Sequence, residues 1–358
     1  MRFPEFKGEW EKCKLEECVV FLDGKRKPIK SSERVSEQKL YPYYGASGII
    51  DYIDDYLFDG KFILLSEDGA NILDRNYRVA FIAEGKIWVN NHAHVLQSND
   101  NIDINFIAEK LESLDYSIYN TGTTMPKLNQ EVCRNIPLWL PPTEEQVKIG
   151  TLLSLLNERI TTQSKIIEDL KKLKSAISLK MLHSDSWEQF KIQDIASIGR
   201  GRVISSVEIS QQENPLYPVY SSQTSNDGIM GYLDDFMFEG EYISWTTDGA
   251  NAGTVFYRNG KFNCTNVCGL LKLKKGFDAH FVSLVLAEAT RMYVSTNLAN
   301  PKLMNNTMGN IQIRLPKLEE QKRISVVFRK LHGLLETHNS LIIKYSKQKQ
   351  YLLSQMFI

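Results

Sequence analysis

The run EEQVKI at residues 144–149 occurs a second time, 175 residues later, as EEQKRI at residues 319–324. From each run onward, apolar residues recur in alternating steps of four and three, which is the spacing of a coiled coil. We call these positions the helix seam. In the first copy they are Ile149, Leu153, Leu156, Ile160, Ile167, Leu170, Ile177 and Met181. In the second copy they are Ile324, Phe328, Leu331, Leu335, Ile342, Tyr345, Leu352 and Met356.

The polar interruptions of the seam are repeated as well. Gln163 corresponds to His338, and Lys174 corresponds to Lys349. Because the two copies share both the apolar positions and the exceptions, we interpret them as an internal duplication. The polar pair Gln163 and His338 either fixes the register of the two helices or reaches solvent at the edge of the seam.

The spacing predicts two long helices, at 143–184 and 318–358, each about 60 Å long at 1.5 Å per residue. Only a few residues separate the end of the first helix from the next copy. For the two halves of the seam to meet, the second helix must therefore run antiparallel to the first. Flush pairing would place Ile149 opposite Met356 and Met181 opposite Ile324.

The duplication extends beyond the helices. Trp10-Glu11 recurs as Trp187-Glu188, the DGAN motif at 68–71 recurs at 248–251, and the PKL motif at 126–128 recurs at 301–303. The second copy gains four residues between its Tyr-Pro and Gly-Ile pairs. We therefore predict globular domains at 1–142 and 185–317, each followed by one long helix.

The globular parts combine both kinds of secondary structure. Short β-type runs separated by Gly, Asp and Asn lie at 62–65, 78–83, 87–90 and 94–97, and again at 242–245, 254–257 and 269–273. Single short helices are expected at 105–114 and 279–289. The predicted fold class is α+β, with two mixed α/β domains separated by a long antiparallel two-helix coiled coil in a pseudo-twofold internal duplication.

Composition excludes several classes of protein. The 43 basic and 43 acidic side chains give no net charge, unlike the basic surplus usual in a solitary nucleic-acid binder. No apolar run is long enough to span a membrane, and residues 1–10 do not resemble a signal peptide. Five cysteines without a tight framework indicate reduced thiols and a cytoplasmic location.

Two similar domains at a fixed separation suit a linear, repeating target, and DNA half-sites lie roughly 34 Å apart per helical turn. The opening RFP at 2–4, GEW at 8–10, the PKL motif and the run LPPTEEQVKI at 140–149 resemble the specificity subunit of a type I restriction–modification system. The second copy has Lys317 where the first has Pro142, so its match is looser. The resemblance covers essentially the whole chain.

The resemblance implies a function and partners. Such a subunit has no catalytic centre, and each domain is a target recognition domain that reads one half of a split, asymmetric site in double-stranded DNA. The helices set the spacer and dock two methylation subunits, and restriction subunits join the complex. S-adenosylmethionine, ATP and Mg are expected on those partners, and no cofactor is expected on this chain.

Side chains of loops near the duplicated motifs are the candidate DNA contacts, because Asn, Gln, Arg, Lys, Ser and Thr read base edges or bind phosphates. The candidates are Tyr44, Ser47, Asn71, Arg75, Thr123, Lys127, Tyr220, Ser222, Gln223, Asn226, Asn251, Arg258, Asn300 and Lys302. For each there is a structural alternative. Polar loops are often only solvated, Asn after Gly is common turn chemistry, and the residues before the helices also suit packing. Differences between the two sets predict different half-sites.

Catalytic and metal sites are not expected. His92 and His94 share one face of a predicted strand but lack a third ligand of recognisable spacing. Cys264 and Cys268 lack the second pair of a structural zinc site. The aspartate pairs at 54–55 and 234–235 suit exposed hairpins better than metal-assisted hydrolysis.

Three other interpretations remain open. The chain could be a two-headed protein-binding adaptor without DNA specificity, or an enzyme acting through its Asp or His clusters. It could also be a specificity subunit of another restriction–modification class.

Overall fold

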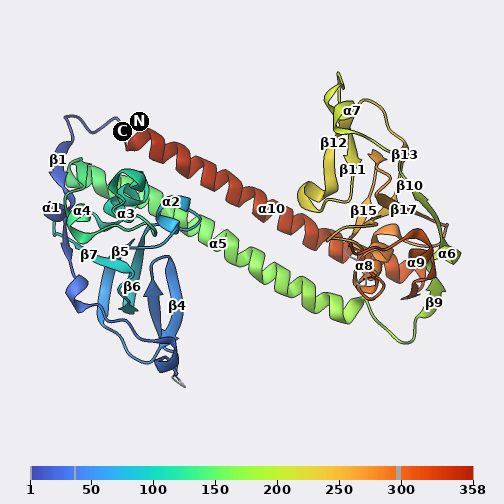
Figure 1. Ribbon diagram of the computed structural model, residues 1–358, viewed down its shortest axis with the longest axis horizontal. Coiled ribbons are helices and arrows are strands. Elements are labelled where there is room, and N and C mark those ends of the chain that lie inside the picture. The colour runs from blue at the N-terminus through green and yellow to red at the C-terminus, as the bar shows by residue number, and fades with distance from the viewer. Residues whose placement is uncertain (1, 36–37, 296–299, 358) are drawn as a thin grey trace. The chain divides into compact units, whose positions relative to one another are not determined.

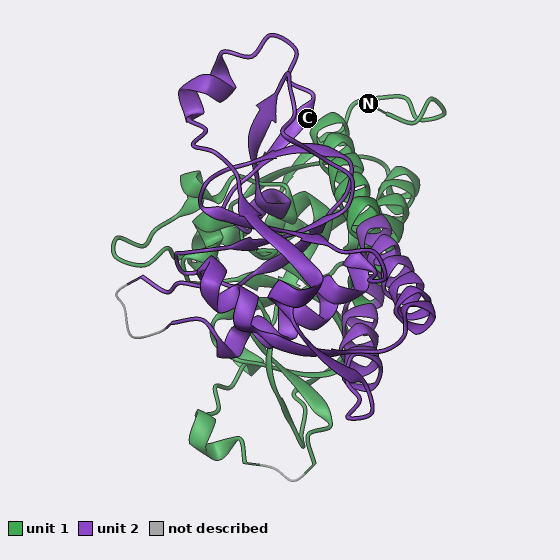
Figure 2. Ribbon diagram, turned by 90° about the vertical axis from the view of Figure 1, so that its right-hand side faces the viewer, with its two compact units in different colours: residues 1–165, 339–358 green, residues 166–338 purple. Residues whose placement is uncertain are grey.

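The computed structural model describes residues 2–35, 38–295 and 300–357. The chain forms two compact units, residues 1–165 with 339–358 and residues 166–338. Figure 2 shows that each unit contains part of both long helices, α5 (Thr143–Met181) and α10 (Leu318–Met356). The predicted domain boundaries at 142, 184 and 317 follow the sequence copies and stay a prediction.

Unit 1 is built mainly on one mixed sheet (Figure 1). Its strands are β1 (Glu11–Lys14), β2 (Val19–Phe21), β3 (Tyr41–Gly45), β4 (Gly48–Ile53), β5 (Phe58–Ser66), β6 (Ala80–Val89), β7 (Ala93–Ser98) and β8 (Pro137–Leu140). Its short helices are α1 (Leu15–Cys18), α2 (Asn71–Asp74), α3 (Ile104–Glu112) and α4 (Gln130–Arg134). The six-stranded sheet has the order β2-β7-β5-β6-β3-β4, and β1 pairs with β8 separately.

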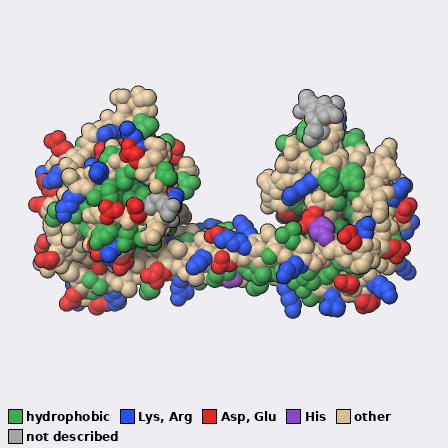
Figure 3. Space-filling view, turned by 90° about the horizontal axis from the view of Figure 1, so that it is seen from below, with side chains coloured by type: hydrophobic (Ala, Val, Ile, Leu, Met, Phe, Trp, Pro, Cys, Tyr) green, Lys and Arg blue, Asp and Glu red, His purple; other side chains and the backbone are tan. Residues whose placement is uncertain are grey.

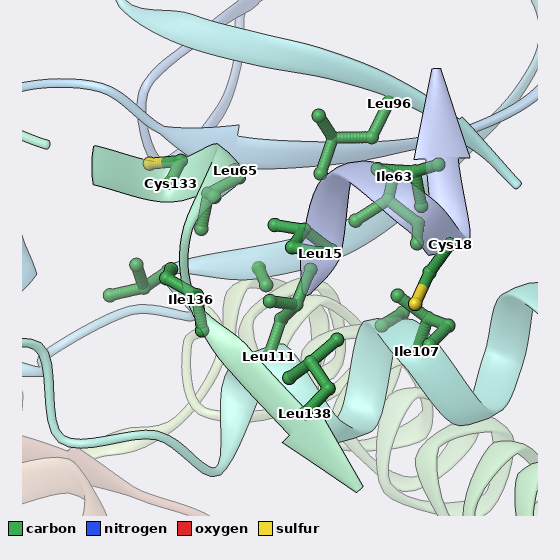
Figure 4. Close-up of a cluster of buried hydrophobic side chains, with 14 of the residues drawn as sticks. Leu15, Cys18, Ile63, Leu65, Leu96, Ile107, Leu111, Cys133, Ile136 and Leu138 are labelled. Carbon is green, nitrogen blue, oxygen red and sulfur yellow. The ribbon is translucent and has the colours of Figure 1, made fainter. Parts of the chain in front are cut away.

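The core of unit 1 lies between this sheet, α3 and the long helices. Figure 4 shows Leu15, Ile63 and Leu65 turned toward Ile107 and Leu111 of α3. From the long helices, Ile149, Leu153 and Met356 belong to the same buried cluster. The domain and the helices therefore share one hydrophobic core.

Unit 2 repeats these elements with a divided sheet. Its strands are β9 (Glu188–Lys191), β10 (Ala196–Arg200), β11 (Tyr217–Tyr220), β12 (Ile229–Leu233), β13 (Phe238–Glu239), β14 (Tyr242–Thr246), β15 (Val255–Arg258), β16 (Lys261–Cys264), β17 (Cys268–Leu273) and β18 (Gln312–Leu315). Its short helices are α6 (Ile192–Ile195), α7 (Ser206–Ser210), α8 (Ala279–Ala289) and α9 (Asn305–Asn310). The sheets have the orders β10-β17-β14-β15, β12-β11-β16-β13 and β18-β9.

The two long helices are antiparallel, as the contacts inside each unit establish. In unit 1, Asn157 of α5 bonds Lys349 of α10, and Arg159, further along α5, bonds Tyr345, which comes earlier in α10. In unit 2, Met181 and Ile324 pack in one core. Every seam position is buried or half-buried, and Ile149, Leu153, Ile324 and Phe328 are at most 3% exposed.

The strands predicted at 78–83 and 87–90 were wrong in one respect, because both belong to β6. Gly85, expected to end a strand, has a φ of 85° and lies opposite Gly60, whose φ is 141°. Both glycines adopt a positive φ, and the pairing of β5 with β6 continues through them. In unit 2 the equivalent pair, Gly240 and Gly260, divides the hairpin into separate strands.

The predicted fold class, two mixed α/β domains with long antiparallel helices, is confirmed. The short helices expected at 105–114 and 279–289 are α3 and α8. Within the described part of the chain, no helix is both long and apolar enough to cross a membrane.

Candidate nucleic-acid interface

The two duplicated motifs of the globular parts meet in space in unit 1. The DGAN motif and the PKL motif pair through a bridge between Asp68 and Lys127. The amide of Gly69 donates to the carbonyl of Pro126 at 3.0 Å, and the amide of Leu128 donates to the carbonyl of Glu67 at 2.7 Å. A turn and a distant loop thus form one surface element.

Unit 2 contains the same element. Asp248 bridges Lys302, the amide of Gly249 donates to the carbonyl of Pro301 at 3.1 Å, and the amide of Leu303 donates to Thr247 at 2.8 Å. The duplication therefore extends to individual hydrogen bonds. The element collects Asn71 and Lys127 in unit 1, and Asn251 and Lys302 in unit 2.

Two of the predicted contacts in unit 1 have structural roles in this conformation. The Asn71 amide closes a loop by bonding the backbone of Tyr77 in both directions, at 2.7 and 3.1 Å. Arg75 has a left-handed φ of 55°, pairs with Glu112 at 3.2 Å and lies over the ring of Tyr116. Their contact with DNA stays a prediction.

The other predicted contacts of unit 1 are Tyr44, Ser47, Thr123 and Lys127. Ser47 and Thr123 are exposed, and Lys127 is exposed with its ammonium 3.5 Å from Glu67. Tyr44 is half-buried against Phe81, and burial raises the pKa of its hydroxyl. Polar side chains are thus available on this surface, with Lys127 its predicted cation.

In unit 2, Asn251 and Asn300 are exposed, and Lys302 is half-buried. The carbonyl of Asn251 accepts hydrogen bonds from the backbone and hydroxyl of Thr254, so the backbone rather than the amide holds this turn. The amide of Asn251 therefore remains on the surface.

The loop between β11 and β12 carries Ser222, Gln223 and Asn226. Gln223 and Asn226 both donate to the carbonyl of Ile229. Asn226 is exposed, whereas Ser222 and Gln223 are half-buried. Two of the loop's own side chains therefore contribute to its conformation.

Arg258, a predicted DNA contact, is buried. Only 2% of the residue is exposed, and its guanidinium bonds Ser244 and Asp227 and stacks on Tyr220. An unpaired charge at this depth would be costly, so the arginine holds the protein's own loop. Tyr220 is half-buried beneath it.

Sequence reasoning missed the polar contacts that attach each domain to its helices. Gln146 accepts from the amide of Asp103 at 3.1 Å and donates to the carbonyl of Pro141 at 2.9 Å. Gln321 makes the same two bonds with Asp278 and Pro316. The glutamine that recurs in both EEQ runs was the sequence signal from which these contacts could have been predicted. The neighbouring Glu145 also binds Arg2, at 2.6 and 2.7 Å.

A second missed group is a buried ionic cluster in unit 1. Glu109 of α3 binds Arg78 at 2.5 Å, Asn157 at 2.7 Å and Lys349 at 2.8 Å. Although burial raises it, the pKa of Glu109 is held below its usual value by Arg78 and Lys349. Lys349, read as a polar interruption of the seam, joins α10 to the domain.

The histidines expected to share a strand face have separate partners. His92 precedes β7 and bonds Asp68 at 2.8 Å, whereas buried His94 bonds Asp23 at 2.6 Å and the carbonyl of Leu128 at 2.8 Å. Although burial acts to lower it, the hydrogen bond to Asp23 raises the pKa of His94 to about 10. His94 thus supports the PKL motif from below.

The remaining candidates for chemistry are dispersed. The aspartate pairs at 54–55 and 234–235 lie in exposed turns, and Cys264 and Cys268 are buried. Across residues 2–35, 38–295 and 300–357, no three His, Cys, Asp or Glu side chains gather as metal ligands.

Each unit contains an open cleft between its domain and its long helices, with volumes of about 510 Å³ in unit 1 and 640 Å³ in unit 2. Asn105 and Asn157 line the first at the positions that His280 and His332 occupy in the second. Burial, followed by the charge of Arg329, lowers the pKa of His280 to about 4. The cleft is therefore present in both units, but different side chains line it.

Acidic and basic side chains are interspersed over the face shown in Figure 3. This agrees with the absence of net charge in the sequence. On this face, phosphates would therefore meet separate basic side chains rather than one large basic surface.

Comparison with known proteins identifies relatives over nearly the whole chain. The family model described as the type I restriction modification DNA specificity domain matches residues 7–172 and again residues 184–344. A protein of Mycoplasma pneumoniae named as a type I specificity subunit is 36% identical over 230 residues, covering 62% of this chain and 95% of that protein.

A Haemophilus influenzae protein, named as a type I restriction enzyme specificity subunit, is 27% identical over 354 residues, covering 91% of this chain and 88% of its own length. The crystal structure of the S subunit of a type I restriction–modification system from M. genitalium has the same fold, with a TM-score of 0.80. The two share 16% sequence identity, and the match covers 100% of this chain and 99% of the other.

Proposed function

The chain belongs to the type I restriction–modification DNA specificity family, and from that premise we propose that each unit reads one half of a bipartite, asymmetric DNA site. The observation that carries this proposal is the repeated pairing of the DGAN and PKL motifs. Both units build the same surface element and place different side chains around it. A common frame with unequal loops suits two related half-sites of different sequence.

The reading surface combines a fixed frame with variable side chains. The bridges Asp68–Lys127 and Asp248–Lys302 are the frame, and each places a lysine beside a turn. Lysine binds phosphates without sequence preference, whereas Asn, Gln, Ser and Thr can read base edges. We assign phosphate contact to the lysines and base reading to the loops that differ between the units.

The long helices serve a second role in this proposal, which is to set the spacing between half-sites and to receive the partners. Their seam is shared by both units, and each helix is anchored to its domain through a buried glutamine. The partners are double-stranded DNA, two methylation subunits and restriction subunits. S-adenosylmethionine, ATP and Mg belong on those subunits, and this chain acts without a catalytic centre.

The alternative of a protein-binding adaptor gains no support from the relatives, which are named as specificity subunits. Five free cysteines and a DNA target favour a cytoplasmic location. A specificity subunit of another restriction class would share the fold but would assemble with a different modification enzyme.

Sequencing of methylated adenine in cells that carry this chain with its methylation partner tests the proposal. We expect a two-part motif whose halves differ. Exchanging residues 185–317 for the corresponding domain of a relative should change one half only. A palindromic motif, or a change in both halves, would contradict the assignment of one half-site to each unit.

A further inference from the structure

The second unit contains a longer loop at a place where the first unit has a short one. Tyr44 pairs with Ile49 across the first loop, and Tyr220 pairs with Ile229 across the second. Residues 45–48 lie between the first pair and residues 221–228 between the second. The second loop therefore has four additional residues above the same strand pair.

This longer loop has an unusual backbone. Asn226, Asp227 and Gly228 have φ values of 49°, 52° and 80°, so three successive residues are left-handed. Asn and Asp adopt this conformation more readily than other residues with a side chain, but as single residues, so a run of three is unusual. The amide of Ser221 donates to the carbonyl of Gly228 at 2.9 Å and closes the base of the loop.

Arg258 supplies the restraint at the centre of the left-handed run. One guanidinium nitrogen donates to the Asp227 carboxylate at 2.6 Å, and the other donates to the Asp227 carbonyl at 2.8 Å. Nε donates to the hydroxyl of Ser244 at 3.0 Å. The planar group lies 3.6 Å from the ring centroid of Tyr220 and 4.4 Å from that of Phe256. Held by two aromatic rings and by hydrogen bonds from three nitrogens, Arg258 is a rigid anchor.

The first unit lacks both partners of this contact. β6 and β15 begin at equivalent residues, Ala80 and Val255, which places Ala83 where the second unit has Arg258. The tyrosine is retained, since Tyr44 packs on Phe81, the equivalent of Phe256. The arginine is therefore present in the unit with the longer loop and absent from the unit with the short one.

We propose that Arg258 and Asp227 are positioning residues that determine the base specificity of the second half-site. They hold residues 221–228 in a single conformation and so fix where Ser222, Gln223 and Asn226 are presented. Arg258 itself is too deeply buried to reach a base. This inference rests on the proposed function, because it assumes that each unit reads one half-site.

The test uses the complete chain in complex with its methylation subunits and a pool of randomised DNA duplexes. The main variant is Asp227→Ala, which removes the carboxylate at a side chain that is 66% exposed. Arg258 keeps its hydrogen bonds to the backbone carbonyl of residue 227 and to Ser244. Asp235→Ala, at an exposed aspartate outside the loop, is the matched control. Arg258→Lys removes the forked contact and keeps the charge.

We expect the unaltered complex and the control to select two distinct half-sites. Asp227→Ala should lose at least about tenfold in discrimination at the second half-site, the scale of one base contact, and keep the first half-site unchanged. Asp227→Asn should lose less, because its amide oxygen can still accept from the guanidinium. A merely structural role would lower the thermal stability without changing base preference.

Retention of the second half-site preference by both Asp227→Ala and Arg258→Lys would overturn the inference. So would an equal loss at both half-sites. A lack of any half-site preference in the unaltered complex would instead overturn the proposed function, so the two failures are distinguishable.

Discussion

The side chain of Gln146 accepts a hydrogen bond from the backbone amide of Asp103, 3.1 Å away, and so joins the first long helix to α3. Asp103 in turn caps α3 by accepting from the amide of Phe106 at 2.7 Å. Gln321, Asp278 and Phe281 repeat this arrangement in unit 2. The EEQ run is thus a joint between domain and helix.

Replacing Gln146 with alanine should destabilise unit 1. The change leaves the amide of Asp103 and the carbonyl of Pro141 without their partner, at about 1–3 kcal/mol for each buried group that remains unsatisfied. Chemical denaturation with a probe in unit 1 measures the effect. The adjacent Val147→Ala, at a side chain that is 46% exposed, should change stability by less than about 0.5 kcal/mol. Equal effects of the two variants would show that the glutamine is not a joint.

Replacing Lys349 with methionine should destabilise unit 1 by about 1.5–3 kcal/mol, because Glu109 loses a charged partner in a buried site. The double variant Glu109→Leu with Lys349→Met should recover much of the loss. Leucine is the residue at the equivalent position of unit 2, Leu284. A double-mutant cycle measures the coupling, and strictly additive effects would argue against the ionic cluster.

The His94–Asp23 pair predicts that unit 1 is weakened by alkali. The folded pKa of His94, about 10, lies above the value of about 6.5 expected when the chain is unfolded. Its stabilisation is therefore complete below pH 6.5 and is lost as the pH rises toward 10. Thermal melts at several pH values should show this decline, and His94→Gln should flatten it. His92→Gln, at a side chain that is 51% exposed, should leave the decline unchanged.

Unit 2 should show the opposite dependence. The pKa of His280 is lowered to about 4 by burial and by Arg329, below its unfolded value of about 6.5. The folded unit then resists protonation, so its stability falls as the pH falls from 6.5 toward 4. His280→Asn, which introduces the residue that unit 1 has at Asn105, should reduce this sensitivity. His183→Asn, at a side chain of the same unit that is 57% exposed, is the control, and an unchanged acid profile for His280→Asn would contradict the assignment.

Lys127→Ala tests the phosphate contact. In complex with the methylation subunits it should weaken binding to all DNA sequences alike and reduce the dependence of log Kd on log salt by about one. Lys12→Ala, at an exposed lysine of β1 outside the predicted contacts, should leave the slope unchanged. A change in base preference without a change in slope would assign Lys127 to base reading instead.

The internal repeat made the architecture predictable from the sequence. The roles of individual polar side chains could not be predicted in the same way. Shared positions such as Ile149 and Ile324 revealed the helix seam, because the residues that a helix buries recur at a regular spacing that can be recognised in the sequence. Arg258 and Arg75 could not be placed, since the direction in which a polar loop side chain turns depends on partners far along the chain. Asp227 lies 31 residues from Arg258, and Glu112 lies 37 residues from Arg75.

The prediction of separate strands at 78–83 and 87–90 was wrong for a related reason. Glycine is typical of turns, but Gly85 lies opposite Gly60 of another strand, and the two strands stay paired through this position. A local pattern cannot show which residue will lie opposite another. Non-local pairing therefore limits what the sequence alone predicts.

Unit 1 contains Met356 in its core, with Leu352, Leu353 and Phe357 packed around it, beside residues as early as Leu15. During translation, the first domain emerges from the ribosome long before these side chains are made. Its core is complete only after the final turns of α10 have been synthesised. A stalled or frameshifted message would therefore release a first domain with an open apolar surface, which quality-control proteases can recognise.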